Sequence, residues 1–135
     1  MKSDLNQLMA ERTLDALVIS GKLLGNPPLI YMLNGAKLTR ALLVQKRDAV
    51  PQLIVSPIER EEAVAAGYPI LLNTRYHYRE LLEQYEGDML AASVAYQLRV
   101  FEDLGVTGRV GYYGYADQGE TFTFLNALNE ASPEV

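Results

Sequence analysis

The sequence predicts an α/β domain in three layers, with helices on both faces of a mixed sheet of about five to six strands. Two observations support this prediction. In the second half of the chain, short apolar segments that suit strands alternate with segments whose apolar residues recur at helical spacing. The length of 135 residues and the hydrophobic content of 49% also suit one compact core and leave no room for two ordinary domains.

The first elements in order are a surface helix and a buried strand. Apolar residues recur at helical spacing over residues 3–13, and Ser3 is the expected cap of this helix. The segment 14–20 is apolar on both faces, which is typical of a central strand, and we expect it to end at Gly21. A break at residues 25–28 then leads into a turn at Asn34-Gly35, a dipeptide that tolerates positive φ.

The middle of the chain predicts a hairpin followed by a capped helix. Residues 39–46 and 52–55 have the pattern of two strands joined by a short connection, so we expect an antiparallel hairpin. Ser56 is expected to accept from the N–H of Glu59, and the Glu59 carboxylate to reach back to Ser56. Pro57 suits the first helical position, where an N–H is not needed. This helix is expected to run to about Gly67.

In the remaining part, aspartate residues mark helix starts and glycine residues mark helix ends, because a carboxylate accepts from the first free N–H groups and glycine adopts the left-handed conformation. Two strands and three helices follow from these signals. In order they are a strand over 69–72, a helix over 78–85 that stops at Gly87, a helix from Asp88 to Gly105, a strand over 109–113, and a helix that Asp117 opens and that ends before Pro133.

Composition excludes several classes of function. The formal net charge is −5 and the Lys and Arg residues are scattered, which argues against a surface for nucleic acid or for an anionic membrane. The chain has no apolar run near the roughly 20 residues that span a bilayer, and its first residues do not resemble a signal sequence, so we expect a cytoplasmic protein. The absence of cysteine excludes disulfides, thiolate metal sites and cysteine nucleophiles.

The sequence contains little recognisable catalytic chemistry. His77 is the single histidine, so no HExxH motif exists, and no G-x-S-x-G motif is present. The loop 21–25 follows a strand, but it lacks the Gly-Lys-Ser/Thr ending of a phosphate-binding loop. Glu59, Glu61 and Glu62 could be metal ligands, although at a helix start they more simply complement the helix dipole. Four glycines recur every third residue: Gly105, Gly108, Gly111 and Gly114. They precede and interrupt a strand, whereas the glycines of a dinucleotide site follow a strand, so this pattern favours turns and close packing over a nucleotide site.

The segment Arg75-Tyr76-His77-Tyr78-Arg79 is the most suggestive patch. Aromatic and basic groups together can stack on a ligand or clamp it. The structural alternative is a loop between a strand and a helix, with tyrosines packed inward and both arginines in water. The patch leaves His77 as a candidate contact.

The order of segments resembles the opening of creatinase, prolidase and aminopeptidase P proteins. In that family a hydrophobic strand is followed by Asn and then by Tyr-Leu-Thr-Gly. Here the strand 14–20 is followed by Asn26 and by Tyr31-Met32-Leu33-Asn34-Gly35, which is one residue longer and has Asn in place of Thr. The later strands, the helix after Ser56 and the segment 110–113 also fit the family, so the resemblance covers essentially the whole chain.

The resemblance implies that residues 1–135 form the creatinase-type N-terminal domain, a fold with a ribonuclease H-like motif. In the family this domain precedes a "pita-bread" catalytic domain, in which two aspartates, a histidine and two glutamates hold two divalent metals such as Mn or Co. That C-terminal domain is absent from this chain, so we expect no cofactor here. The implied partners are the pita-bread domain of the same protein and a second copy in a homodimer, with no nucleic acid and no membrane.

The function that the resemblance implies is a non-catalytic domain of a metal-dependent Xaa-Pro peptidase that contributes to dimerisation and substrate access. The candidate access residues are Tyr31, Asn34, Arg40 and His77. The structural alternative places Tyr31 in the core, Asn34 in a turn and Arg40 in solvent. Two other functions stay open: a stand-alone α/β interaction or dimerisation module without hydrolase activity, and a small enzyme that binds nucleotide or phosphate at the loop 21–25.

Overall fold

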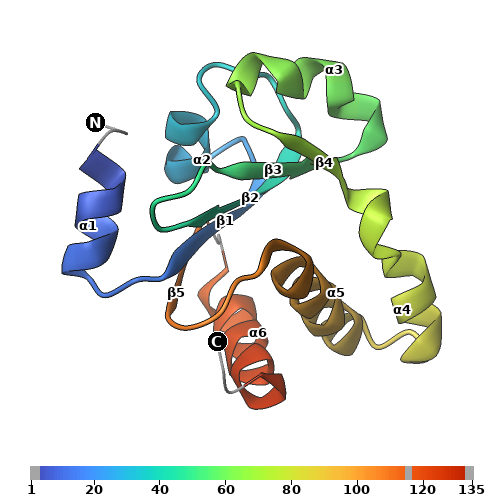
Figure 1. The fold of residues 1–135 in the computed structure, drawn as a ribbon. Helices are drawn as coiled ribbons and strands as arrows, with labels where there is room; N and C mark the ends of the chain where they lie inside the picture. The colour runs from blue at the N-terminus through green and yellow to red at the C-terminus, as the bar shows by residue number, and fades with distance from the viewer. Residues whose placement is uncertain (1–3, 115–116, 133–135) are drawn as a thin grey trace.

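The computed structural model describes residues 4–114 and 117–132 (Figure 1). One five-stranded sheet has the order β4-β3-β2-β1-β5. Pairs β1–β2 and β2–β3 are antiparallel, whereas β1–β5 and β3–β4 are parallel, so β2 alone runs against the other strands. The predicted mixed sheet is therefore confirmed, with five strands: β1 (Ala16–Lys22), β2 (Arg40–Lys46), β3 (Gln52–Val55), β4 (Ile70–Leu72) and β5 (Val110–Tyr113).

Helices cover both faces of this sheet, which confirms the three-layer prediction (Figure 1). One face carries α1 (Leu5–Glu11), α2 (Pro27–Met32) and α3 (Arg60–Ala63). The other face carries α4 (Tyr78–Gln84), α5 (Met89–Leu104) and α6 (Gln118–Ala131). The 3-10 turns η2 (Pro57–Glu59) and η3 (Val64–Ala66) flank α3, and η4 (Asn73–Tyr76) connects β4 to α4.

The core consists of two apolar clusters, one on each face, because successive side chains of a strand point to opposite sides. Along β1, Leu17 and Ile19 belong to the cluster beneath α1 and α2, where Leu29 is fully buried. Ala16 and Val18 belong to the cluster beneath α5 and α6. The continuous apolar run of β1 in the sequence is explained by this burial on both faces.

The expected end of the first strand at Gly21 is wrong. Strand β1 continues through Gly21, which pairs with Ala41, and ends at Lys22. The loop that remains before α2 is too short to match the proposed phosphate cradle, because two of its five residues form strand. Gly21 has φ of 122°, a conformation that glycine adopts readily, and the pairing with β2 satisfies its backbone groups.

The break at residues 25–28 is in fact the start of a helix that the sequence analysis did not predict. Asn26 is the N-cap of α2, and its side chain accepts from the Leu29 N–H at 3.3 Å. The Asn26 amide also donates to the Ser20 carbonyl at 3.1 Å, which ties the helix start to the end of β1. Pro27 occupies the first helical position, where proline is favoured rather than disruptive.

The expected reciprocal cap at Ser56 is also wrong in part. Pro57 opens the first turn as predicted, but the Ser56 hydroxyl accepts from Ile58 N–H at 3.4 Å rather than from Glu59. The Glu59 carboxylate accepts from the Thr39 N–H at 2.6 Å instead. The segment then forms α3 between two 3-10 turns rather than one continuous helix, and it ends at Gly67 in the left-handed conformation as expected.

The caps of the long helices are confirmed. Asp88 accepts from Ala91 N–H at 3.1 Å, and Asp117 accepts from Glu120 N–H at 2.8 Å. Gly105 ends α5 in the left-handed conformation. For α1 the expected cap Ser3 lies outside the described residues, and so does Pro133 after α6. Within residues 4–114 and 117–132, no helix is long and apolar enough to cross a bilayer.

Candidate functional site

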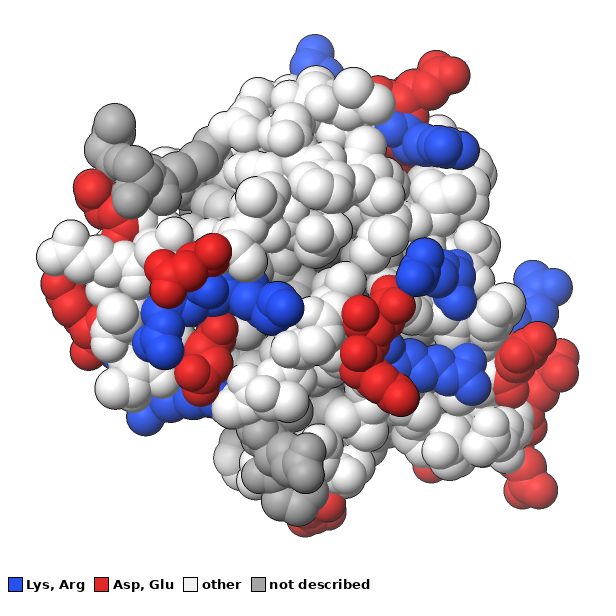
Figure 2. Space-filling model, in the orientation of Figure 1, with Lys and Arg blue, Asp and Glu red and all other residues white. Residues whose placement is uncertain are grey.

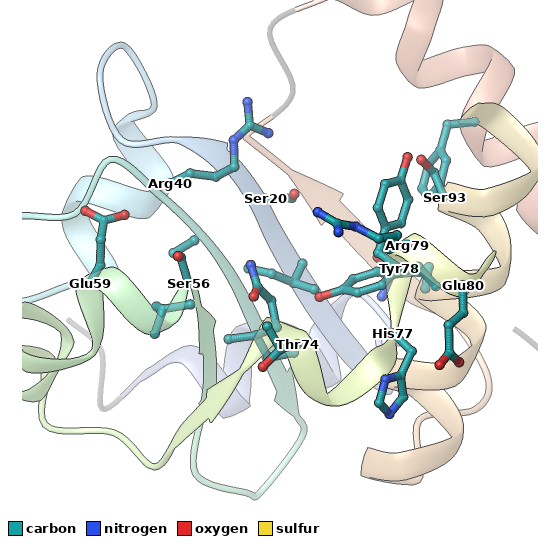
Figure 3. Close-up of a pocket in the computed structure, with 18 of the residues that line it drawn as sticks. Ser20, Arg40, Ser56, Glu59, Thr74, His77, Tyr78, Arg79, Glu80 and Ser93 are labelled. Atoms are coloured by element: carbon teal, nitrogen blue, oxygen red, sulfur yellow. The ribbon is translucent and has the colours of Figure 1, made fainter. Parts of the chain in front are cut away.

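A groove of about 810 Å³ lies along one edge of the sheet, between the strands and helices α4 and α5 (Figure 3). Ser20 near the end of β1, Ser56 after β3 and Asn73 after β4 line it, together with Arg40 at the start of β2. This edge therefore carries the carboxyl ends of the parallel strands. Ligands of open α/β sheets usually bind outside the carboxyl ends of the strands. We call this cavity the sheet-edge groove.

The interior of the sheet-edge groove is mainly apolar. Leu42 and Ile54 belong to the sheet, whereas Tyr78, Tyr96 and Phe124 come from the helices that face it. Tyr96 packs edge to face on Tyr78, with ring centroids 6.0 Å apart. Ligand sites typically combine such an apolar lining with a few placed polar groups.

Two arginines supply positive charge to this groove. Arg40 and Arg79 stand on different walls, and the Arg79 guanidinium projects toward the middle (Figure 3). In the described part of the chain neither side chain forms an ion pair. Of the carboxylates, Glu59 is held by the Thr39 N–H, and Glu80 points away from the middle (Figure 3).

Gln97 on α5 is a buried polar residue in the wall of the groove. It is only 4% exposed, and its Nε2 group has no hydrogen-bond partner among the residues that the structure describes. A buried donor without a partner costs about 1–3 kcal/mol, so native structures rarely keep one without reason. No sequence pattern pointed to this residue.

The structure places Arg40 and His77 in the sheet-edge groove and the other two predicted site residues elsewhere. The His77 backbone is left-handed, with φ of 54°, and its imidazole points away from the middle of the groove (Figure 3). Tyr31 on α2 lines a separate apolar groove of about 400 Å³ with Leu8 and Tyr113. The four candidates are therefore not one constellation.

Asn34, the fourth candidate, ties two loops together. Its backbone has φ of 55°, and Gly35 follows with φ of 86°, which confirms the predicted turn. Its Nδ2 donates to the Ala66 carbonyl at 2.7 Å, and the Tyr68 hydroxyl beside it donates to the Met32 carbonyl at 2.6 Å. This network holds the end of α2 against the end of η3.

The role of Asn34 in stability is testable with two substitutions. Asn34→Gly keeps a residue that tolerates positive φ and removes the bond to Ala66, so we expect a loss of about 1 kcal/mol in unfolding free energy. Asn34→Ala adds the cost of the left-handed backbone, for a total of about 2 kcal/mol. Urea unfolding measures both variants. Equal stability of wild type and Asn34→Gly would show that the bond to Ala66 contributes nothing.

In the patch 75–79, the first two residues stabilise the fold and the last three line the groove. Arg75 donates to Asp103 through Nε at 3.1 Å and Nη2 at 3.0 Å, and the Tyr76 hydroxyl donates to the same carboxylate at 2.8 Å. These hydrogen bonds, that from Arg75 first, lower the pKa of Asp103. Burial, reinforced by Asp103, raises the pKa of Tyr76. Tyr76 thus packs inward as the structural alternative expected, whereas Arg75 is paired. His77, Tyr78 and Arg79 line the groove.

Burial of Tyr96 predicts sensitivity to alkaline pH. Desolvation raises its pKa to about 12, above the value of about 10 in an unfolded chain. The folded state therefore keeps its proton longer, and the resulting stability is present below pH 10 and is lost as pH rises through about 12. We expect Tyr96→Phe to flatten the fall in melting temperature above pH 10. Tyr85→Phe is the control on an exposed ring, and an equal effect of both variants would contradict this cause.

The remaining sequence-based hypotheses find little geometric support. In the described ranges, no group of three or more His, Cys, Asp or Glu side chains could hold a metal ion, and Glu61 and Glu62 are exposed on α3. Gly105 ends α5 and Gly111 lies within β5, as turn and packing roles predict. On the face that Figure 2 shows, basic and acidic groups lie interspersed around a broad uncharged area.

No protein-family model and no curated protein sequence matches the chain. Several solved structures are similar to it. The prolidase of Pyrococcus furiosus is 16% identical with a TM-score of 0.56, and the match covers 96% of this chain and 33% of that one. The prolidase of Pyrococcus horikoshii is 16% identical with a TM-score of 0.52, over 95% of this chain and 28% of that one. This chain thus spans about a third of their length.

A third similar structure is the N-terminal domain of Xaa-Pro dipeptidase from Lactobacillus brevis. It is 13% identical with a TM-score of 0.54, and the match covers 91% of this chain and 84% of that one. At these identities the likeness shows the fold. The fold that the family resemblance implied is therefore confirmed.

Proposed function

We propose that this chain is the N-terminal domain of a cytoplasmic, metal-dependent Xaa-Pro peptidase of the prolidase and aminopeptidase P type. In this proposal the domain performs no chemistry and contributes to dimerisation and to substrate access. The observation that carries the proposal is the match to the solved N-terminal domain of an Xaa-Pro dipeptidase, which extends over most of both chains. Because one fold can serve several functions, the site residues must be tested directly.

The proposal assigns the chemistry to a C-terminal pita-bread domain. There, two divalent metals such as Mn or Co would activate water, which needs several converging carboxylates and imidazoles. The described residues of this chain offer no such group. His77 and Glu59 line one groove, but Glu59 is held by the Thr39 N–H and the imidazole points away from the middle (Figure 3).

The separate apolar groove that Tyr31 lines supports the dimerisation part of the proposal. Leu8, Tyr31 and Tyr113 are 41%, 53% and 40% exposed and line the same groove with the α1 and α2 side chains. Contiguous apolar surface of this kind typically marks contact with another protein surface. In the proposal a second copy or the catalytic domain covers it, and Tyr31 belongs to that contact.

The access part of the proposal assigns Arg40 and His77 to the substrate path. Asn34 supports it by tying the loop before β2 to Ala66 of η3. Arg40 is exposed at the start of β2 and forms no ion pair in the described ranges, so its charge is available to a peptide carboxylate. A residue that contacts substrate without joining the chemistry changes KM and leaves kcat unchanged.

The test begins with the continuous reading frame that contains these residues. The proposal predicts several hundred further residues with the metal ligands, whereas a stop codon near Val135 would favour a stand-alone interaction module. In the full product, Arg40→Gln is expected to raise KM for an Xaa-Pro dipeptide at constant kcat, with Arg60→Gln on α3 as the matched control. An unchanged KM in both Arg40→Gln and His77→Ala would refute the access role.

A further inference from the structure

We propose that the sheet-edge groove binds a small organic carboxylate with an apolar body. This binding requires only residues of this chain, so it stands or falls independently of the peptidase proposal. Two observations carry it: the size and apolar lining of the groove, and two arginines without ion-pair partners in the described residues.

The groove has the dimensions and lining of a small-molecule site. Its volume of about 810 Å³ lies within the usual range of roughly 300–1,000 Å³ for such sites. Leu42 and Ile54 form an apolar wall on the sheet, and Tyr96 and Phe124 face it from α5 and α6. The aromatic or branched aliphatic part of a ligand would therefore be buried between the sheet and the helices.

The charged groups favour a carboxylate at one end of the ligand. Guanidinium groups bind carboxylates through paired N–H donors, and the groove contains Arg40 and Arg79 without competing ion pairs in the described ranges. Glu59 accepts from the Thr39 N–H but keeps its negative charge, whereas Glu80 points away from the middle (Figure 3). Glu59 and Glu83 therefore leave negative charge in the lining, so a ligand ammonium is the rival to be tested.

Gln97 on α5 belongs to the wall of the groove and is 4% exposed. Its Nε2 atom has no hydrogen-bond partner among the described residues, but it is closed off from solvent, so it does not bind a ligand as the side chain stands. The lining contains no glycine-rich loop, which disfavours a phosphate cradle.

The experiment is an NMR titration of the 135-residue chain with 3-phenylpropionate. Saturable backbone shifts are expected at Ala41, Leu42 and Gln97, which line the groove. The neutral match 3-phenylpropionamide and inorganic phosphate are expected to bind at least about tenfold more weakly, since each lacks one half of the recognised chemistry. Absence of saturable shifts in these residues, equal binding of the amide, or tighter binding of L-phenylalanine overturns the proposal.

Substitutions assign the binding to the named groups. Arg79→Gln at an exposed position is expected to lower the affinity about tenfold, whereas Arg60→Gln outside the groove leaves it unchanged. Wild-type affinity in Arg79→Gln overturns the assignment.

Discussion

Replacing Leu43 with alanine is expected to lower the free energy of unfolding by about 3 kcal/mol. Leu43 is 0% exposed on β2, where it pairs with Ile19 on one side and Leu53 on the other. The truncation loses the transfer free energy of the side chain and leaves a cavity that paired neighbouring strands cannot close. Because a domain of this size has a total stability of about 5–15 kcal/mol, the change is a large fraction of it.

Leu24→Ala is the matched control, because it removes the same atoms from a side chain that is 95% exposed. We expect it to change stability by less than about 0.5 kcal/mol. Urea unfolding monitored by circular dichroism measures both variants, and an unchanged m value shows that the unfolded states are comparable. Equal stability of the two variants would contradict the position of β2 in the middle of the sheet.

Gly114→Ala is expected to destabilise the domain by about 3 kcal/mol or more, through two separate effects. The first is backbone strain, because Gly114 has φ of 89°. The second is steric: an added Cβ would lie 2.7 Å from the Ser20 carbonyl oxygen and 2.8 Å from the Asn26 amide. That amide caps α2 and is bonded to Ser20, so the neighbours cannot move without loss of the cap.

Gly25→Ala separates the two effects. Gly25 has φ of 73°, but nothing lies within 4 Å of a Cβ built there, so this variant reports backbone strain alone at about 1 kcal/mol. The difference between the two variants measures the contact of the chain after β5 with Ser20 and Asn26. Similar melting temperatures for both variants would mean that this contact is looser than the structure shows.

Elements whose signals are local in the sequence were predicted correctly. Asp88 and Asp117 each cap N–H groups only three residues ahead, and Gly105 ends α5 within one turn. The hairpin β2–β3 needs only two strand patterns and a short connection. In these cases the backbone partner lies within a few residues, so a sequence pattern contains all the information.

The errors have a different physical cause, namely partners that are distant in the chain. Glu59 bonds to Thr39, twenty residues away, because that N–H competes for the carboxylate that would otherwise cap its own helix. Helix α2 was missed since its six residues show too little periodicity, and its cap Asn26 is fixed by Ser20. Neither contact is visible in a local pattern.

The candidate site was predicted only in part for the same reason. Arg40 and His77 come together in one groove because β2 is antiparallel to its neighbours and begins where β1, β3 and β4 end. Gln97 lies in a helix that reads as an ordinary amphipathic segment, and its unpaired amide exists only in the packed structure. Strand order and burial, rather than motifs, define this site.

The most direct test of the proposed accessory role compares two proteins under the same conditions, the isolated 135-residue chain and the product of the full reading frame. Each is incubated with an Xaa-Pro dipeptide and Mn²⁺ or Co²⁺, and released proline is measured. We predict hydrolysis by the full product and none by the isolated chain, because the proposal assigns the groups that bind metal and activate water to the C-terminal domain. Metal-dependent hydrolysis by the purified isolated chain would contradict the account.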